Sequence, residues 1–518
     1  MLRGIVTVGA WTLASRILGF VRDILIAARL GAGPVADAFF VALRLPSLFR
    51  RLFGEGAFAA AFVPGFTGTL AAEGREAARA YAEQAFALML IGLGLLVIAG
   101  EVFMPQVMLG LAPGFAAIPA KFALAVTLSR LTFPYLVLIC LAALVSGVLN
   151  GLDRFTAASA SYLLFNVVMI AALLWLTPFL PSAGHALAVG VTLSGLAQLG
   201  VLLVAARRAG MRLRLVRPRL TPPMRALLRR MAPGLVGAGV TQLNLAVDVI
   251  IASLLPAGTV SVLYYADRVN QLPLGTIGTA VGTALLPLLA RQIRAQALVE
   301  LRATLNQALA LALALTLPAA FALMLLAEPI MLALFRHGAL SGAAAAKSAA
   351  ALAAYAIGLP AFVLAKLFSP GFFARGDTKT PVKIGVIAVF LNLALNLALM
   401  RPLGYLGPPL ATSLAAFFNA FALALLLARA GHFGPDRALL GRIGRILAAA
   451  LAMVLALALA RAAILHAWPG LLANPLGAIA MLAGLIPFGL LCYGGAGLGL
   501  GAFTLDWLRG MLRRRSRV

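Results

Sequence analysis

Long apolar runs, rich in Leu and Ala, recur along the whole chain and are separated by short polar segments. A helix needs about 20 apolar residues to cross a bilayer, whereas the strands of a membrane barrel alternate apolar and polar residues over about ten positions. These runs do not alternate, so the pattern predicts helices. We predict an all-α polytopic membrane protein with fourteen spans. The predicted spans are 5–28, 35–53, 84–106, 123–149, 157–179, 185–205, 233–255, 262–289, 303–326, 347–373, 382–400, 405–428, 443–465 and 475–503.

Composition and charge narrow the class of protein. The chain has 518 residues, of which 63% are hydrophobic and 11% charged, a composition that excludes a soluble globular protein. A net charge of +27 first suggests nucleic acid. Most of the arginines, however, lie in short loops between spans, where they set topology and meet anionic lipid headgroups, so we expect membrane lipids and no nucleic acid. The two cysteines, Cys140 and Cys492, lie in apolar segments and predict neither a disulfide nor a metal site.

The distribution of basic residues predicts the topology. Segment 206–232 holds nine arginines and the C-terminus holds a further group, whereas the opposite loops hold few basic residues. By the positive-inside rule, this asymmetry predicts that both termini are cytoplasmic. The few basic residues of the opposite loops are Arg29, Lys121, Arg336, Lys347, Arg401 and Arg461.

A weak internal repeat suggests two lobes. The stretch DILIAARLGAG at 23–33 resembles DVIIASLLPAG at 248–258, and both precede an aromatic pair at the same offset. Transporters are often built from such repeats, with the substrate site between them. We predict two six-helix lobes in pseudo-repeat plus two C-terminal helices. The predicted parts are an N-lobe at 1–206, a basic linker at 207–232, a C-lobe at 233–430, and spans 13 and 14 with a basic tail at 431–518.

Charged side chains interrupt the apolar runs, and their excess is basic. A charge at the centre of a membrane helix costs about 2.5–3.5 kcal/mol on insertion scales, so such residues usually line a wet cavity. The surplus of guanidinium groups, whose planar fork suits phosphate, predicts a cavity that binds an anion. These residues are Arg16, Arg22, Asp37, Arg44, Arg50, Arg51, Glu55, Arg130, Asp248, Asp267, Arg268 and Lys366.

Residues 37–55, taken as one helix, place a polar stripe on one face. Asp37, Arg44 and Arg51 are seven residues apart and Glu55 lies four beyond, so the stripe is about 27 Å long. An alternative is that the charges form structural ion pairs, and Lys366 either joins the cavity or extends to the interface. The candidate pairs are Arg51 with Glu55, Arg22 with Asp23, and Arg268 with Asp267.

Polar residues within the apolar segments could also bind a cation or support catalysis. Asn392 and Asn396 are four residues apart, and with Asp248 and Thr412 they offer oxygens to a cation at membrane depth; the alternative is hydrogen bonding between helices. The four histidines lack acid or cysteine partners at useful spacing, and no Walker-type loop is present. The sequence therefore does not predict an enzyme.

Several motifs resemble the MurJ (MviN) family of bacterial lipid II flippases, in the multidrug/oligosaccharidyl-lipid/polysaccharide exporter superfamily. The resemblance covers essentially the whole chain, including the number of spans. The motifs are SRILGFVRDILIAARLGAG, ADAFFVALRLPSLFRRLFGEGAFAAAFVP, YYADRVNQLPLGTIGTAVGTALLP and KLFSPGFFARGDTKTPVKIG.

The resemblance implies two lobes around a cationic cavity, with a groove for the lipid tail at spans 13 and 14. Two departures bear on ion coupling: Asn396 stands where an acid is expected, and Gln271 where some members carry Glu. The implied substrate-binding residues are Arg16, Arg22, Arg50 and Arg268; the cavity or gate charges are Asp37, Arg51, Glu55, Asp267 and Lys366; the implied sodium ligands are Asp248, Asn392, Asn396 and Thr412.

Taken together, these features predict a flippase that moves lipid II from the cytoplasmic to the periplasmic leaflet of the inner membrane by alternating access, with the arginines binding its pyrophosphate. No cofactor is expected beyond a sodium ion, and the partners implied are lipid II, membrane lipids and peptidoglycan synthesis proteins. One alternative is an exporter of another lipid-linked oligosaccharide or of drugs; a drug exporter would favour acidic residues in the cavity. The other is a non-transporting scaffold of the synthesis machinery.

Overall fold

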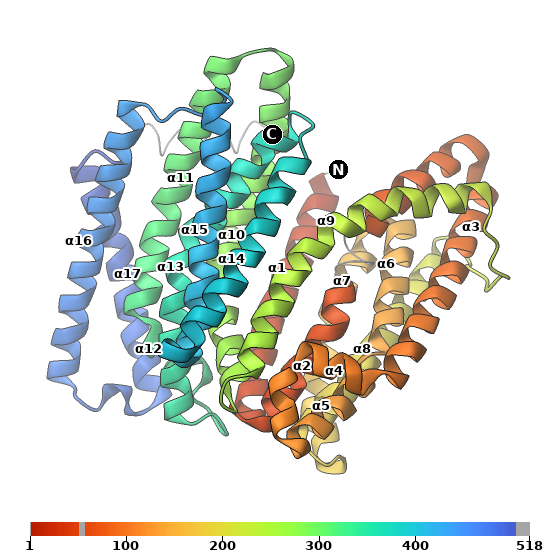
Figure 1. Cartoon of the computed structure of the whole chain (residues 1–518), viewed down its shortest axis with the longest axis horizontal. Helices are drawn as coiled ribbons and strands as arrows, with labels where there is room; N and C mark the ends of the chain where they lie inside the picture. Colours follow the sequence, from red (N-terminus) through yellow and green to blue (C-terminus); the bar gives the residue numbers. More distant parts are fainter. Residues whose placement is uncertain (1, 51–56, 504–518) are drawn as a thin grey trace. The chain divides into compact units, whose positions relative to one another are not determined.

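The structure is a computed structural model that describes residues 2–50 and 57–503, and every regular element in these residues is helical (Figure 1). Within this part of the chain, nine helical stretches are long and apolar enough to cross a membrane. Two of them, Pro119–Gly151 and Lys379–Arg429, each contain two successive α-helices. The prediction of an all-α polytopic membrane protein is confirmed, and the number of fourteen spans stays a prediction.

The chain divides into two compact units, which are described separately. Unit 1 comprises Met1–Ser261 and Gly338–Leu340, and unit 2 comprises Val262–His337 and Ser341–Val518. The predicted linker 207–232 therefore falls inside unit 1. The helices that begin in unit 1 are α1 (Leu2–Leu30), α2 (Pro34–Phe49), α3 (Ala57–Val102), α4 (Met104–Leu111), α5 (Pro119–Thr132), α6 (Tyr135–Gly151), α7 (Phe155–Ala171), α8 (Ala183–Arg208), α9 (Pro222–Ser253) and α10 (Thr259–Arg294). The helices of unit 2 are the remainder of α10, α11 (Leu298–Leu325), α12 (Ala327–Phe335), α13 (Gly342–Phe373), α14 (Lys379–Leu403), α15 (Gly407–Arg429), α16 (Arg437–Ala467) and α17 (Pro475–Gly499).

Helix α3 differs from the predicted spans, because the apolar pattern ended one span at residue 53 and began the next at 84. The structure is helical from residue 57 to 102, with a break only at Gly74, whose φ of 86° and ψ of −172° reverse the chain direction. Glycine adopts this conformation without a steric penalty. Residues 70–83 combine Ala with Glu and Arg, all of which favour helix, and the charged residues interrupt the apolar pattern, so the helices continue past the predicted spans.

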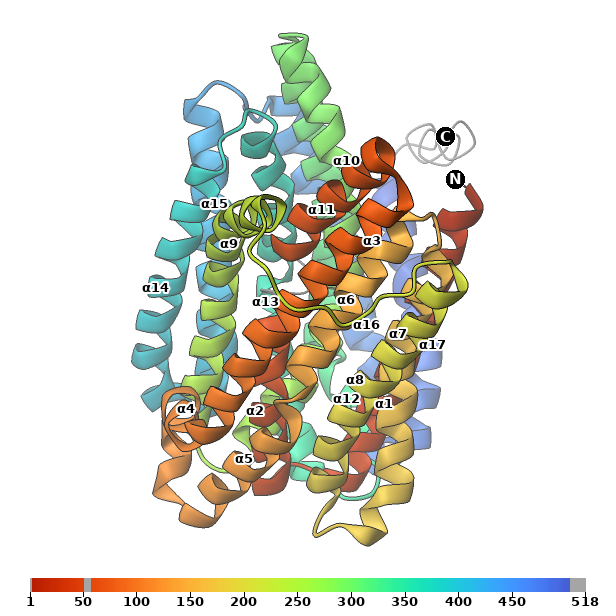
Figure 2. The same ribbon diagram turned by 90° about the vertical axis from the view of Figure 1, so that its right-hand side faces the viewer.

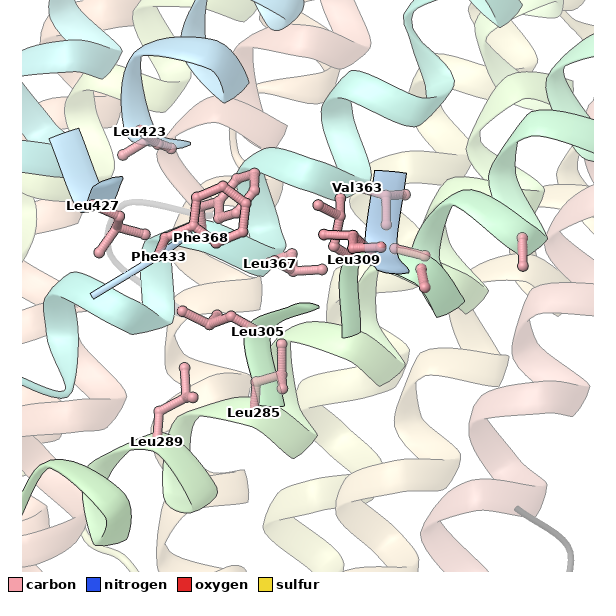
Figure 3. Close-up of a cluster of buried hydrophobic side chains, with 14 of the residues drawn as sticks. Leu285, Leu289, Leu305, Leu309, Val363, Leu367, Phe368, Leu423, Leu427 and Phe433 are labelled. Atoms are coloured by element: carbon pink, nitrogen blue, oxygen red, sulfur yellow. The ribbon is translucent and has the colours of Figure 1, made fainter. Parts of the chain in front are cut away.

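Packed leucine and phenylalanine side chains form the core of unit 2 (Figure 3). Leu305 of α11 and Leu367 of α13 are fully buried in it. The ring of Phe433, in the loop after α15, packs edge-on against Phe368 of α13 at 5.2 Å between centroids. Because lipid tails are as apolar as leucine, such helices associate through close packing rather than through removal of water.

Candidate functional site

Asp37, predicted as a cavity or gate charge, is fully buried in the first turn of α2. One oxygen, Oδ2, accepts hydrogen bonds from the Lys121 ammonium at 2.7 Å and from the Gly258 amide at 2.7 Å. The other, Oδ1, accepts from the amide and the hydroxyl of Ser261, both at 2.9 Å. The carboxylate thus joins α2 to α5, to the turn before α10 and to the first turn of α10, all within unit 1.

Lys121 matches Asp37 in burial, with 4% of the residue exposed. Its ammonium lies 3.9 Å from the centroid of the Phe115 ring, a cation–π contact that adds to the ion pair. The sequence placed Lys121 in a loop, and the structure places it in the first turn of α5. Since the two opposite charges neutralise each other, this arrangement holds helices together and leaves no net charge for an anion.

Arg22 is also buried, with 6% of the residue exposed, and its guanidinium is bound on both sides. Its Nε and Nη2 donate to Asp23 Oδ1 at 3.0 and 2.6 Å, and its Nη1 donates to Asn166 Oδ1 at 2.9 Å. The guanidinium also lies 5.3 Å from the centroid of the Phe165 ring. The Arg22–Asp23 pair, which the sequence offered as an alternative to anion binding, is therefore present.

Asn166 of α7 was not predicted, and it holds Arg22 in place. Its Nδ2 donates to the carbonyl of Ser15 at 3.0 Å and to the Ser15 hydroxyl at 3.3 Å. The amide thereby connects α7 to two turns of α1. The only sequence signal was a single amide inside the apolar run LLFNVVMI, which is typical of a polar side chain that bonds between membrane helices.

Arg16 and Arg50 differ from Arg22 in their exposure. Arg16 is exposed on α1, and Arg50, half-buried after α2, lines a small pocket that is open to the surface. Arg51 and Glu55 lie outside the described residues, so the far end of the predicted stripe is not seen. The other residues that line the pocket come from α6 and α7: Ile139, Ala142, Ala143, Ser146, Ser161 and Tyr162.

In unit 2, Asp267 and Arg268 are half-buried neighbours on α10. Asp267 Oδ1 accepts a hydrogen bond from Gln271 Nε2 at 3.3 Å, so the glutamine that replaces an expected acid binds an acid here. Lys366 is exposed on α13, and its side chain crosses Gly278 of α10. A methyl group added at 278 would lie 3.0 Å from Lys366 Cδ and 3.3 Å from its Nζ.

The residues predicted for sodium fall in both units: Asp248 is half-buried in α9 of unit 1, and the others lie in unit 2. Asn392 and Asn396 of α14 are fully buried, and Asn396 Nδ2 donates to the Asn392 carbonyl at 2.9 Å and to its Oδ1 at 3.0 Å. Asn396 Oδ1 is buried and has no donor among the described residues. A buried acceptor oxygen suits a hard cation, but two amides bring no negative charge. No group of three or more His, Cys, Asp or Glu side chains that could hold a metal occurs within residues 2–50 and 57–503.

Comparison with known proteins identifies the family. The family model for lipid II flippase MurJ matches residues 26–473. A probable lipid II flippase MurJ of Rhizobium meliloti (strain 1021) is 44% identical over 513 residues, which cover 98% of this chain and 95% of that protein. The lipid II flippase MurJ of Burkholderia cenocepacia is 35% identical over 499 residues, covering 95% and 96% of the two chains.

Solved structures agree in fold. A lipid II flippase MurJ in an inward closed conformation is 24% identical, has a TM-score of 0.79, and covers 95% of this chain and 98% of its own. An inward-facing multidrug resistance MATE family transporter of the MOP superfamily is 16% identical, has a TM-score of 0.66, and covers 80% and 94%. The matches confirm the resemblance seen in the sequence motifs: the chain belongs to the lipid II flippase MurJ family, whose members are transporters and not enzymes.

Proposed function

We propose that this protein moves lipid II, an undecaprenyl-pyrophosphate-linked disaccharide-pentapeptide, from the cytoplasmic to the periplasmic leaflet of the bacterial inner membrane. The support is its membership of the MurJ family across nearly its whole length, with 44% identity to one relative. The headgroup carries phosphates, sugars and carboxylates, and it cannot cross hydrocarbon unaided because each buried charge costs several kcal/mol. No bond is made or broken.

The observation that carries the proposal furthest is the pocket beside Arg50. Arg50 lines this small open pocket together with Ser146 and Tyr162, so a phosphate that approaches its mouth would meet both a charged donor and hydroxyl groups. We propose that Arg16, Arg22 and Arg50 of unit 1 and Arg268 of unit 2 bind the pyrophosphate during the transport cycle. For Arg22, this requires its bonds to Asp23 and Asn166 to be exchanged for bonds to the substrate.

The proposed topology has fourteen spans, with both termini in the cytoplasm. The two six-helix lobes alternate between inward-open and outward-open states, and the headgroup passes through the cavity while the lipid tail stays in the bilayer along α16 and α17. The hydrogen bonds of Asp37 and Arg22 described above belong to one of these states. In the other state they are either broken or kept while the helices that they join move together. Arg51, Glu55, Asp267 and Lys366 are proposed as further charges of the cavity or its gates.

Net transport needs a source of energy. The membrane potential acts on the negative headgroup with about 2.3 kcal/mol per charge per 100 mV. A sodium ion held by Asn392 and Asn396, with Asp248 and Thr412 as further proposed ligands, would add a second source. The neutral amide at position 396 favours weak binding of this ion. Peptidoglycan synthesis proteins remain proposed partners.

The proposal is tested in cells depleted of their own lipid II flippase. Arg50→Ala and Arg268→Ala should each reduce growth and cause lipid II to accumulate in the cytoplasmic leaflet, at normal protein levels. Arg50→Lys separates charge from geometry, because lysine keeps the positive charge but cannot donate the planar pair of hydrogen bonds. Lys347→Ala is the matched control, since Lys347 is an exposed cation at the start of α13, outside the proposed site.

Other outcomes would reject the proposal. Normal lipid II transport by both alanine variants would remove the pyrophosphate-binding role. Accumulation of a different lipid-linked oligosaccharide on depletion of this protein would change its substrate. A protein whose cavity charges are dispensable, and whose loop substitutions alone impair wall synthesis, would instead be a scaffold.

A further inference from the structure

The basic segment between α8 and α9 forms an extended strap, residues 211–220, that the transport proposal does not use. It has no helix or strand of its own, and it runs beside α3 (Figure 2). Its first residue, Met211, is 1% exposed and donates its amide to the Ala206 carbonyl at 2.9 Å. An extended segment anchored at its start in this way has a defined path.

The strap is fastened to α3 through its backbone rather than its side chains. The amide of Arg214 donates to Glu83 Oε1 at 2.9 Å, and the amide of Arg219 donates to Gln84 Oε1 at 2.9 Å. In return, Gln84 Nε2 donates to the Arg217 carbonyl at 3.4 Å. Because these bonds use main-chain groups, they leave the guanidinium groups of the strap available.

The point on α3 to which the strap is bound indicates its depth relative to the membrane. Glu83 and Gln84 are the last polar residues before the apolar run of α3 that begins at Ala85, and the strap starts where the apolar part of α8 ends in Arg207 and Arg208. A polar-to-apolar boundary on a membrane helix marks the headgroup region of the bilayer. Two helices of unit 1 therefore place the strap in the plane of the membrane interface.

The side chains of the strap suit a position at the membrane interface. Its four arginines are all exposed, and no ion pair is recorded for them within the described part of the chain: Arg212, Arg214, Arg217 and Arg219. Leu215, which lies between Arg214 and Arg217, is 72% exposed, and Leu220, which follows Arg219, is 54% exposed. Interleaved arginine and leucine at an interface suit a surface that is anionic at the level of the phosphates and apolar just beneath. An acidic protein surface would match the arginines but not the leucines.

We infer that residues 211–220 bind the phosphate groups of anionic phospholipids, with Leu215 and Leu220 inserted between the lipid chains. Docking to lipid on one side and to Glu83 and Gln84 on the other holds the connection between α8 and α9 against α3. This surface is separate from the proposed pyrophosphate pocket, and its test does not depend on transport.

Spin labels on the full-length protein in bilayer nanodiscs measure the depth of the strap. Cys140 and Cys492, the native cysteines, are first replaced by Ala and Ser. Labels are then placed singly at Leu215→Cys, at Glu76→Cys and at Leu95→Cys. Glu76 is exposed and stands about 10 Å beyond Glu83 along α3, and Leu95 is exposed in its apolar run, so the two bracket the interface.

In nanodiscs of equal parts phosphatidylcholine and phosphatidylglycerol, the label at 215 should show oxygen accessibility between those of the labels at 76 and 95. In phosphatidylcholine alone it should become more accessible to a water-soluble relaxant. An anionic surface strengthens the binding of each nearby arginine by about fivefold, so Arg212→Gln, Arg214→Gln, Arg217→Gln and Arg219→Gln together should abolish the difference between the two bilayers. The same four positions changed to Lys should retain it.

Two results would overturn the inference. A label at 215 as water-accessible as the label at 76 in the anionic bilayer would show that the strap is not docked, and would leave an acidic protein as the partner for its arginines. A label depth that is the same in both bilayers and unaffected by the Gln substitutions would show that anionic headgroups are not bound.

Discussion

The two units differ in the polar groups that they bury. In unit 1, two ion pairs are buried, and further hydrogen bonds hold both: Asp37 with Lys121, and Arg22 with Asp23. In the described part of unit 2, the buried polar groups are mostly neutral, and several of their oxygens lack a donor: those of Asn270, Asn306, Ser348, Asn396 and Asn419. Unpaired buried oxygens also occur in unit 1, at Glu101 and Gln242, so the difference between the units lies in the buried ion pairs, which among the described residues fix helices of unit 1 in a defined arrangement.

The largest effect is expected at Asp37. Asp37→Ala removes the carboxylate and leaves the Lys121 ammonium buried without its partner, which should reduce the free energy of unfolding by about 3–5 kcal/mol. Thermal unfolding of the purified protein in detergent measures this loss as a lower Tm. Gly258 and Ser261 would also lose the acceptor of their amides.

The double variant Asp37→Ala/Lys121→Met is the control for this prediction. Because it removes both charges, it should recover a large part of the loss, as replacing a whole buried pair is far milder than breaking it. If the double variant were as unstable as Asp37→Ala alone, the coupling between Asp37 and Lys121 would be negligible and the contrast between the units would fail.

The second pair predicts a smaller effect, through Asn166. Asn166→Ala leaves Arg22 Nη1 without its acceptor, which should cost about 1–3 kcal/mol of stability. Ser15→Ala removes only the longer of the two bonds that Asn166 Nδ2 donates, since the bond to the Ser15 carbonyl remains. This variant should lose about 0.5–1 kcal/mol of the free energy of unfolding. Chemical or thermal unfolding of both variants checks the ranking, and equal losses would mean that Asn166 does not act by positioning Arg22.

The hydrophobic pattern was enough to predict the all-α membrane class, because long apolar runs that do not alternate with polar residues are typical of membrane helices and not of barrel strands. It was not enough to place the ends of the helices. Around Gly74, Ala, Glu and Arg residues favour helix while their charges interrupt the apolar pattern, so α3 extends well beyond the predicted span. The family was also accessible from the sequence, through motifs at residues 15–33, 36–64, 264–287 and 366–385.

The partners of the charges were less predictable. The spacing of Asp37 and Arg44 placed them on one face, yet it could not show that Lys121, 84 residues later, binds Asp37. Partners from distant helices depend on tertiary packing, which periodicity does not encode. The Arg22–Asp23 pair was foreseen because its members are adjacent, whereas Asn166 was missed because it lies 144 residues from Arg22.

In unit 2, the unmatched oxygen of Asn396 predicts a modest response to sodium. If sodium binds the folded protein at about five times its Kd, it should stabilise by about 1 kcal/mol, seen as a Tm higher in sodium chloride than in choline chloride. Asn396→Leu should remove the difference, and Asn396→Asp should enlarge it by adding a negative charge. A Tm difference that is unchanged in Asn396→Leu would place any sodium effect elsewhere in the protein.

The smallest effect is expected at His432, in the loop between α15 and α16 of unit 2. Burial lowers the pKa of this imidazole below its usual value, and the positive charges of Arg375 and Arg302 lower it further. Its Nδ1 is buried without a partner among the described residues, so the neutral form gains no compensating bond. Unlike the paired charges of unit 1, this group avoids an energetic cost by staying uncharged.

The sign of the pH dependence follows from this lowered pKa. Below about pH 6.5 the unfolded chain binds a proton at His432 more readily than the folded protein does, so stability is present above that pH and declines as the pH falls through the folded-state pKa. Between pH 7.5 and 5.5, the Tm of the wild type should therefore fall more than that of His432→Asn, by roughly 1 °C. Arg375→Gln should shrink the same difference by removing one of the repelling charges. If the Tm of the wild type and that of His432→Asn changed in parallel with pH, His432 would be protonated as easily in the folded loop as in the unfolded chain. Its charged form would then be compensated in unit 2 as the buried ion pairs are in unit 1.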